Sequence, residues 1–174
     1  RSKKFGDAVS MLRAAAASAG TKDEATDLRS VAATYEQVGR AYNRGMSPGA
    51  KPIEAYAELR RALNLDSSSG AFKDELQGKL AQVAPRAAIQ FFLAKDYETA
   101  YQAIRVAEQF GSTSGDLKGV RDNLSSTAQR LYSEAAAEIG TNPDEAKAKL
   151  KQVKGMVDSK SSVWAKAHKL LNGG

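Results

Sequence analysis

Hydrophobic residues recur along this chain three and four positions apart, which is the spacing of one face of an α-helix. The clearest example runs from residue 95 to residue 110, where Tyr97, Ala100, Ile104 and Ala107 share one stripe at 3.6 residues per turn. A small alanine once per turn lets a second helix approach closely, and the larger residues fill the space beside it. The segment therefore predicts a helix that packs against other helices.

Similar stripes occur in three other segments, and the equivalent alanines are Ala8, Ala55, Ala100 and Ala146. Their separations are 47, 45 and 46 residues, so the sequence predicts a unit that repeats at this interval. The first stripe, from Phe5 to Ala15, corresponds to the second helix of such a unit. The first helix of that unit would lie before residue 1. We therefore expect the chain to be a piece of a longer protein.

Turn-forming and capping residues divide the pattern into helices. Residues 21–24, Thr-Lys-Asp-Glu, form a capping box, and Asn142 followed by Pro143 marks another helix start. Pro85 lies inside a helical pattern, where it removes one hydrogen bond, and it predicts a kink or break just before it. The expected elements of one domain, residues 1–174, are a half repeat at 3–19, repeats at about 22–66, 71–111 and 116–157, and a terminal helix at 161–172.

Two segments, residues 35–66 and 84–110, resemble the tetratricopeptide repeat (TPR) family. Residues 38–42, Val-Gly-Arg-Ala-Tyr, are similar to the Leu-Gly-x-x-Tyr pattern of the family's first helix, and the alanine stripes are similar to its second helix. The family period is about 34 residues, so the longer period here indicates lengthened first helices. The packing positions are Ala8, Leu12, Gly39, Tyr42, Ala55, Leu59, Ala88, Phe91, Ala100, Ile104, Ala146 and Leu150.

The resemblance implies an all-α fold, a TPR-like superhelix of about eight antiparallel helices that are alternately long and short. First helices would line its concave face. In the family, residues beside the packing positions of the first helix contact an extended peptide. Carried over residue by residue, these candidates are Glu36, Arg40, Asn43, Arg44, Gln82, Arg86, Ile89 and Phe92. Because arginine binds carboxylates through paired hydrogen bonds, the three arginines indicate an acidic peptide.

Charge and composition exclude several other classes. The 26 Lys and Arg residues exceed the 20 Asp and Glu residues by six, which favours acidic partners, although we interpret the lysines after residue 142 as a solvated helix face. Cysteine is absent, and one histidine, His168, cannot form a multi-histidine metal site. No phosphate-binding glycine motif and no run of about 18 apolar residues occurs. We therefore predict no catalytic residues, metal, cofactor or membrane span.

The main hypothesis is a non-catalytic module that binds a protein or peptide segment in a helical groove. A second is an architectural or spacer role in a larger signalling or envelope protein, in which the chain docks to its own copies or to the rest of its parent. A third, RNA binding, is disfavoured because no base-reading residue pair recurs in each repeat. The sequence does not identify the compartment, and we slightly favour the cytoplasm over the periplasm.

Overall fold

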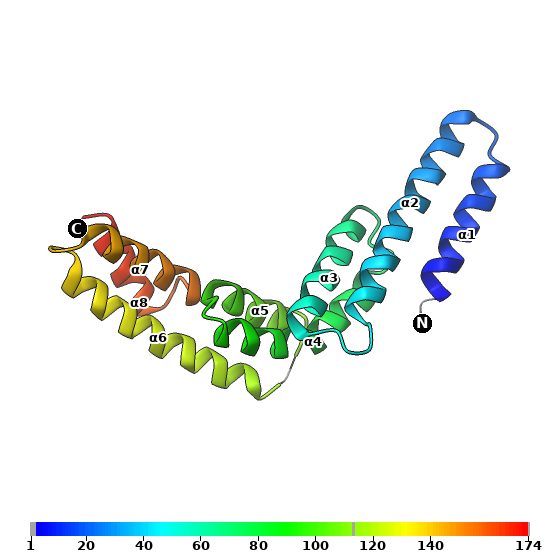
Figure 1. Cartoon of the computed structure of the whole chain (residues 1–174). Helices are drawn as coiled ribbons and strands as arrows, with labels where there is room; N and C mark the ends of the chain where they lie inside the picture. The colour runs from blue at the N-terminus through cyan, green and yellow to red at the C-terminus, as the bar shows by residue number, and fades with distance from the viewer. Residues whose placement is uncertain (1–2, 113, 174) are drawn as a thin grey trace. The chain divides into compact units, whose positions relative to one another are not determined.

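The computed structural model describes residues 3–112 and 114–173, and this part of the chain is all-α, with eight α-helices, one short 3₁₀ helix and no strand (Figure 1). The predicted all-α fold class is therefore confirmed, whereas the TPR-like superhelix stays a prediction. The elements are α1 (Lys3–Ala17), α2 (Lys22–Gly45), α3 (Pro52–Leu65), η1 (Asp66–Ser68), α4 (Lys73–Leu93), α5 (Tyr97–Gln109), α6 (Asp116–Glu138), α7 (Pro143–Met156) and α8 (Ser162–Leu171).

Long and short helices alternate from α2 to α7, as the sequence predicts. The helices α2, α4 and α6 have 24, 21 and 23 residues, whereas α3, α5 and α7 have 14, 13 and 14. The sequence predicts a kink or a break before Pro85, and the break is absent, since α4 runs without interruption through this residue. Proline costs one backbone hydrogen bond, but residues on both sides of Pro85 hold the helix through buried side chains.

Polar side chains begin several of the helices. The hydroxyl of Thr21 accepts a hydrogen bond from the Glu24 backbone N–H at 3.2 Å, and the Glu24 carboxylate accepts one from the Gly20 N–H at 3.2 Å. The capping box therefore reaches one residue further back than the usual pattern. Asn142 makes no side-chain cap, because its amide nitrogen donates to the Glu145 carboxylate instead.

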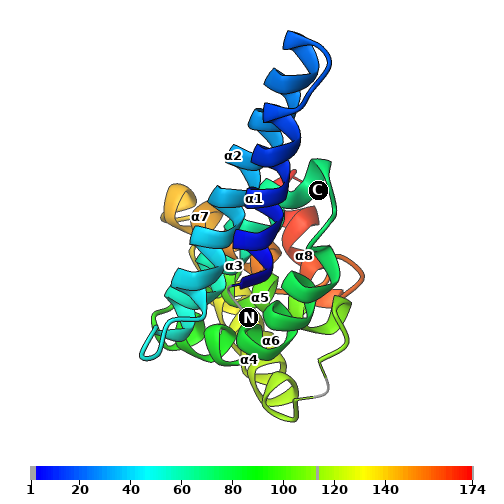
Figure 2. The ribbon, with the colours of Figure 1, turned by 90° about the vertical axis from the view of Figure 1, so that its right-hand side faces the viewer.

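The helices form two compact units, Arg1–Val83 and Ala84–Gly174, and the boundary lies inside α4. In the first unit α1 packs against α2, and α2 packs against α3, as antiparallel hairpins (Figures 1 and 2). The α2–α3 approach is very close at Gly45, where a Cβ atom would lie 3.0 Å from Leu59 Cγ and 3.1 Å from the Ala55 carbonyl oxygen. Glycine is required at this point of contact.

An aromatic cluster joins α1, α2 and the start of α4. The Phe5 ring centroid lies 5.1 Å from that of Tyr42 and 4.4 Å from that of Phe72, and Tyr35 meets Phe72 edge-on at 5.1 Å. The Tyr42 hydroxyl donates to the Glu75 carboxylate at 3.1 Å. These contacts bring residues from three helices into one apolar core, with the polar end of Tyr42 satisfied.

The packing face of α1 differs from the predicted stripe. Its buried residues are Phe5, Val9 and Ala16, whereas Ala8 and Leu12 are only half-buried and Ala15 is exposed. Ala8 therefore lies in unlike surroundings from Ala55, Ala100 and Ala146, which are all buried. The reason is that Phe5 packs directly against Gly39 of α2, which turns α1 so that a neighbouring stripe is covered.

A buried carboxylate closes the loop between α3 and α4. Asp66 is 1% exposed, and its two oxygens accept hydrogen bonds from the Ser69 hydroxyl at 2.6 Å and the Phe72 backbone N–H at 2.9 Å. Both oxygens are therefore satisfied, as a buried charge requires. The contact fixes Phe72 at the position where its ring meets Phe5 and Tyr35.

In the second unit α5 and α6 each pack against the next helix and against the one after that. The helix α5 contacts α6 and α7, α6 contacts α7 and α8, and α7 also contacts α8. This arrangement places α5 and α7 in one layer and α6 and α8 in another. The recurrent alanines Ala100 and Ala146 are fully buried between the layers, as are Ile104 and Leu150.

Candidate functional site

The last three turns of α2 carry four of the candidate groove residues. Glu36, Arg40, Asn43 and Arg44 are four, three and one positions apart, so they share one side of the helix. Arg40, Asn43 and Arg44 are exposed and Glu36 is half-buried. The backbone of this segment is fixed from the opposite side by buried Val38, which lies among the packing residues of α2.

Two hollows lie along this part of α2, and Asn43 lines both of them. The first, of about 420 Å³, is formed by Phe5, Gly6, Val9, Ser10 and Arg13 of α1 and by Glu36, Gly39, Arg40 and Asn43 of α2. The second, of about 520 Å³, is formed at the α2–α3 turn by Asn43, Arg44, Ser47, Pro48, Gly49, Ala50 and Glu54. Four predicted groove residues thus line neighbouring depressions in the first unit.

The charged side chains of these hollows are already paired. Glu36 accepts a hydrogen bond from Arg40 Nη2 at 2.7 Å through one carboxylate oxygen, and from Arg13 Nη2 at 3.0 Å through the other. The hydrogen bond and charge of Arg40, followed by those of Arg13, lower the pKa of the Glu36 carboxyl. At the second hollow, Arg44 Nη2 donates to Glu58 at 2.9 Å, which lowers the pKa of Glu58 and raises that of Arg44.

Arg13 is the residue of this group that sequence reasoning missed. It lies on α1, and the resemblance that selected the groove candidates considers only the first helix of each repeat. Its position eight residues after Phe5 and four after Val9 places it next to the buried stripe of α1. That signal becomes visible only when the true packing face of α1 is known.

The remaining groove candidates do not join these hollows within the first unit. Gln82 is exposed on α4 and accepts a hydrogen bond from Lys79 Nζ at 3.3 Å. Arg86, Ile89 and Phe92 belong to the second unit. There Arg86 is exposed, and the half-buried Phe92 packs its ring 5.6 Å from that of Tyr97.

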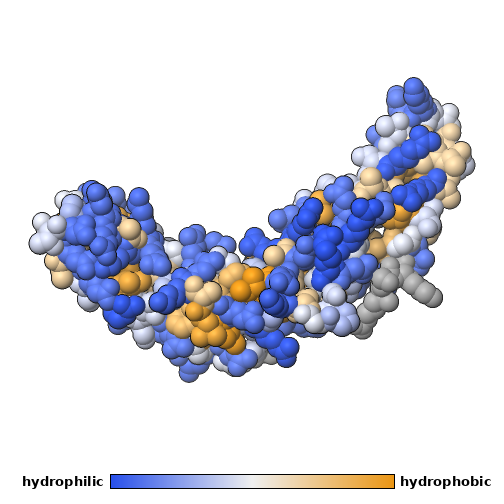
Figure 3. Space-filling view, in the orientation of Figure 1, coloured by the Kyte–Doolittle hydropathy of each residue, from blue (hydrophilic) through white to orange (hydrophobic). Residues whose placement is uncertain are grey.

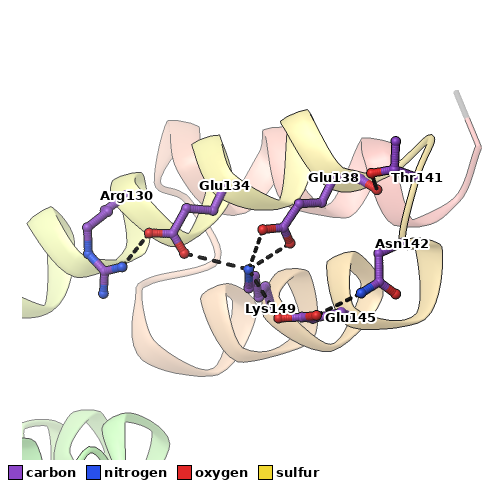
Figure 4. Close-up of polar contacts among 7 residues, drawn as sticks. All are labelled: Arg130, Glu134, Glu138, Thr141, Asn142, Glu145 and Lys149. Atoms are coloured by element: carbon purple, nitrogen blue, oxygen red, sulfur yellow. Dashed lines mark hydrogen bonds and ion pairs between the residues drawn. The ribbon is translucent and has the colours of Figure 1, made fainter.

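The lysines after residue 142 are not all solvated. Lys147, Lys151, Lys166 and Lys169 are exposed, but the Lys149 side chain is only 18% exposed. Figure 4 shows its ammonium group among three carboxylates, at 2.6 Å from Glu138, 3.5 Å from Glu145 and 3.7 Å from Glu134. This contact ties α7 to α6, so Lys149 has a structural role. The hydrogen bond and charge of Glu138, aided by Glu145, raise its pKa.

The single histidine lies in a small polar cluster at the α7–α8 contact. The His168 ring stacks on that of Trp164 with centroids 4.8 Å apart, and Lys154 Nζ lies 3.1 Å from His168 Nδ1. Lys154 also lies 5.0 Å from the centroid of the Trp164 ring. The cluster joins the end of α7 to α8. The contact between the two helices is a cation–π interaction of Lys154 with the Trp164 ring.

On the face shown in Figure 3 the residues are mostly hydrophilic, with apolar residues in small separate patches. Within residues 3–112 and 114–173, no three His, Cys, Asp or Glu side chains are grouped so that they could hold a metal ion. Over the same residues, every helix is too short or too polar to cross a bilayer.

Comparisons with models of protein families, with curated proteins and with solved structures find no match to this chain. The resemblance to the TPR family therefore depends on the residues quoted from the sequence.

Proposed function

We propose that this chain is a non-catalytic, TPR-like interaction module and that the Arg40 side of α2 binds an acidic peptide segment. The observation that carries the proposal is the pair of neighbouring hollows, which share Asn43 and are bordered by Arg40 and Arg44. An extended peptide lying along α2 would meet a guanidinium group at each hollow and an amide group between them.

The internal ion pairs are compatible with this role. Arg40 and Arg44 each use the Nη2 atom to bind a glutamate, and a guanidinium group has five N–H donors. Their side chains are 66% and 51% exposed. Ion pairs with this much solvent contact contribute little to stability, so an incoming carboxylate can share or replace the internal one.

The layered contacts of the second unit support the repeat part of the proposal. Stacked helix hairpins place every helix beside the second helix along the chain, which is the relation of α5 to α7 and of α6 to α8. In this proposal the long helices are the first helices of the repeats, with added turns at their starts. This accounts for the alternation of long and short helices.

The test is a selection of binders from a random peptide library. Peptides enriched on the wild-type chain should carry Asp or Glu, and their affinity should fall by roughly tenfold or more in the double variant R40E/R44E, because two attractive contacts become repulsive. The control is K22E/R29E, which makes the same change of charge at exposed positions on the same helix. Enrichment without acidic residues, or equal loss in both variants, would contradict the proposal.

A further inference from the structure

Glu36 holds arginines from two different helices at the same time. Arg13 comes from α1 and Arg40 from α2, and each donates through Nη2 to a different oxygen of the one carboxylate, at 3.0 and 2.7 Å. One carboxylate between two guanidinium groups is the arrangement that a bound acidic side chain would adopt. In this structure the position belongs to a residue of the chain itself.

The helices that carry the two arginines are held together independently of Glu36. Beneath them, Phe5 and Val9 are 3% and 8% exposed, and a Cβ atom at Gly39 would lie only 2.9 Å from Phe5 Cβ. The α1–α2 contact is therefore tight, and it sets the distance between the helices that carry Arg13 and Arg40. The spacing of the two helices, and therefore the places from which Arg13 and Arg40 extend, would persist if the Glu36 side chain turned outward.

We propose that Glu36 is an internal competitor in a carboxylate subsite, and that an acidic side chain of the bound peptide replaces it between Arg13 and Arg40. This inference rests on the proposed function, because it concerns the ligand of the same hollow. The competitor is easily displaced. The side chains of Arg13, Arg40 and Glu36 are 61%, 66% and 37% exposed, so water can take over the carboxylate as it leaves.

Competition by Glu36 weakens the binding of any carboxylate from outside. A ligand binds only the fraction of molecules in which the subsite is open, so its apparent affinity is reduced by that fraction. The arginines lower the pKa of the Glu36 carboxyl, so acidification opens the subsite only at a lower pH than the one at which an ordinary glutamate is protonated. Release of Glu36 therefore depends on the charge and concentration of the ligand.

The experiment uses a fluorescein-labelled tetraglutamate peptide as the probe and measures its anisotropy at low ionic strength, where exposed charges are least screened. Removing the competing charge in E36Q should strengthen binding by about fivefold. The matched control is D27N, which removes one negative charge from an exposed residue of the same helix. Its gain should be small. The single variants R13Q and R40Q should weaken binding, and R13Q should cancel the gain when combined with E36Q.

The outcomes separate this inference from the proposed function. If R40E/R44E abolishes binding while E36Q binds no better than D27N, the module binds acidic peptides but Glu36 is not a competitor. If R13Q leaves the affinity for tetraglutamate unchanged, Arg13 does not belong to a carboxylate subsite, whichever affinity E36Q shows. Binding of tetraglutamine as strong as that of tetraglutamate would overturn both proposals. Circular dichroism of each variant checks that the helices remain folded.

Discussion

A single residue with a left-handed backbone ends α4. Lys95 has a φ of 62°, and the bonds from its N–H to Phe92 and from the Asp96 N–H to Phe91 form a Schellman motif. The end of α5 has the same motif, with Gly111 at a φ of 79° in the equivalent position. Glycine adopts this conformation without steric cost, whereas lysine does not.

The substitution K95G should therefore stabilise the second unit by about 0.5–1 kcal/mol. The reciprocal change G111K should destabilise it by about 1 kcal/mol, and a Cβ atom at this position would meet nothing within 4 Å, so only the backbone conformation is tested. Urea unfolding followed by fluorescence of Trp164, the only tryptophan, measures both changes. Equal midpoints for K95G and the wild type would show that the turn carries no strain.

The residue scale also explains which candidate side chains could be found from the sequence. Glu36, Arg40, Asn43 and Arg44 were selected through the resemblance to the TPR family, and their spacing along one helix places them on one side of α2. Arg13 was missed because its nearness to Arg40 depends on how two helices pack. Glu58, the partner of Arg44, was missed for the same reason, because it lies on α3.

Polar contacts between helices add to apolar packing at the level of the elements. Lys149 is the clearest example, since it reaches from α7 to the glutamates of α6 and lies close to Glu145 as well (Figure 4). Without the ammonium group three carboxylates would be left near one another, with no cation between them. The α6–α7 hairpin therefore depends on one cation in addition to buried Ala146 and Leu150.

The variant K149M should lower the midpoint of thermal unfolding, measured by circular dichroism, by more than K147M, which alters an exposed lysine of the same helix. The pKa of Lys149 is raised from 10.5, so its contribution is fully present below pH 10.5 and is lost as the pH rises through the higher value of the folded state. The difference between wild type and K149M should therefore disappear in strongly alkaline solution. A difference that is unchanged there would show that the stem of Lys149, rather than its charge, stabilises the hairpin.

The helices themselves follow from the sequence to within one or two residues at most ends. The predicted segment 161–172 corresponds to α8 at Ser162–Leu171, and the predicted half repeat 3–19 corresponds to α1 at Lys3–Ala17. The face that α1 buries does not follow, because Ala8 and Val9 are both apolar and the choice between them depends on Phe5 meeting Gly39.

On the scale of the whole chain, the two compact units divide within α4, between Val83 and Ala84. Arrays of helix hairpins are stabilised mainly by contacts between neighbouring hairpins. A substitution that destabilises one unit can therefore leave the stability of the other unchanged. The spacing of the alanines predicts one array of repeats over residues 1–174. That the two units form a single array stays a prediction.

The variant G45A tests the independence of the units. A methyl group at residue 45 would lie 3.1 Å from the Ala55 carbonyl oxygen, and this overpacking should cost about 1–3 kcal/mol. Amide hydrogen exchange of the full chain should then be faster in α1, α2 and α3, whereas α6 and α7 should keep their protection. Faster exchange by the same factor in all helices would mean that the chain unfolds as one cooperative unit.

The sequence by itself determined the helices, the capping box at Thr21, the alternation in helix length and the repeated alanines, because these depend on residues close together along the chain. The tertiary structure alone decided which face α1 buries, that Arg13 joins Arg40 around Glu36, and that Lys149 is surrounded by carboxylates. These features depend on the approach of helices from distant parts of the sequence. Side-chain spacing along one helix carries no information about the distance to a second helix, and close packing supplies it.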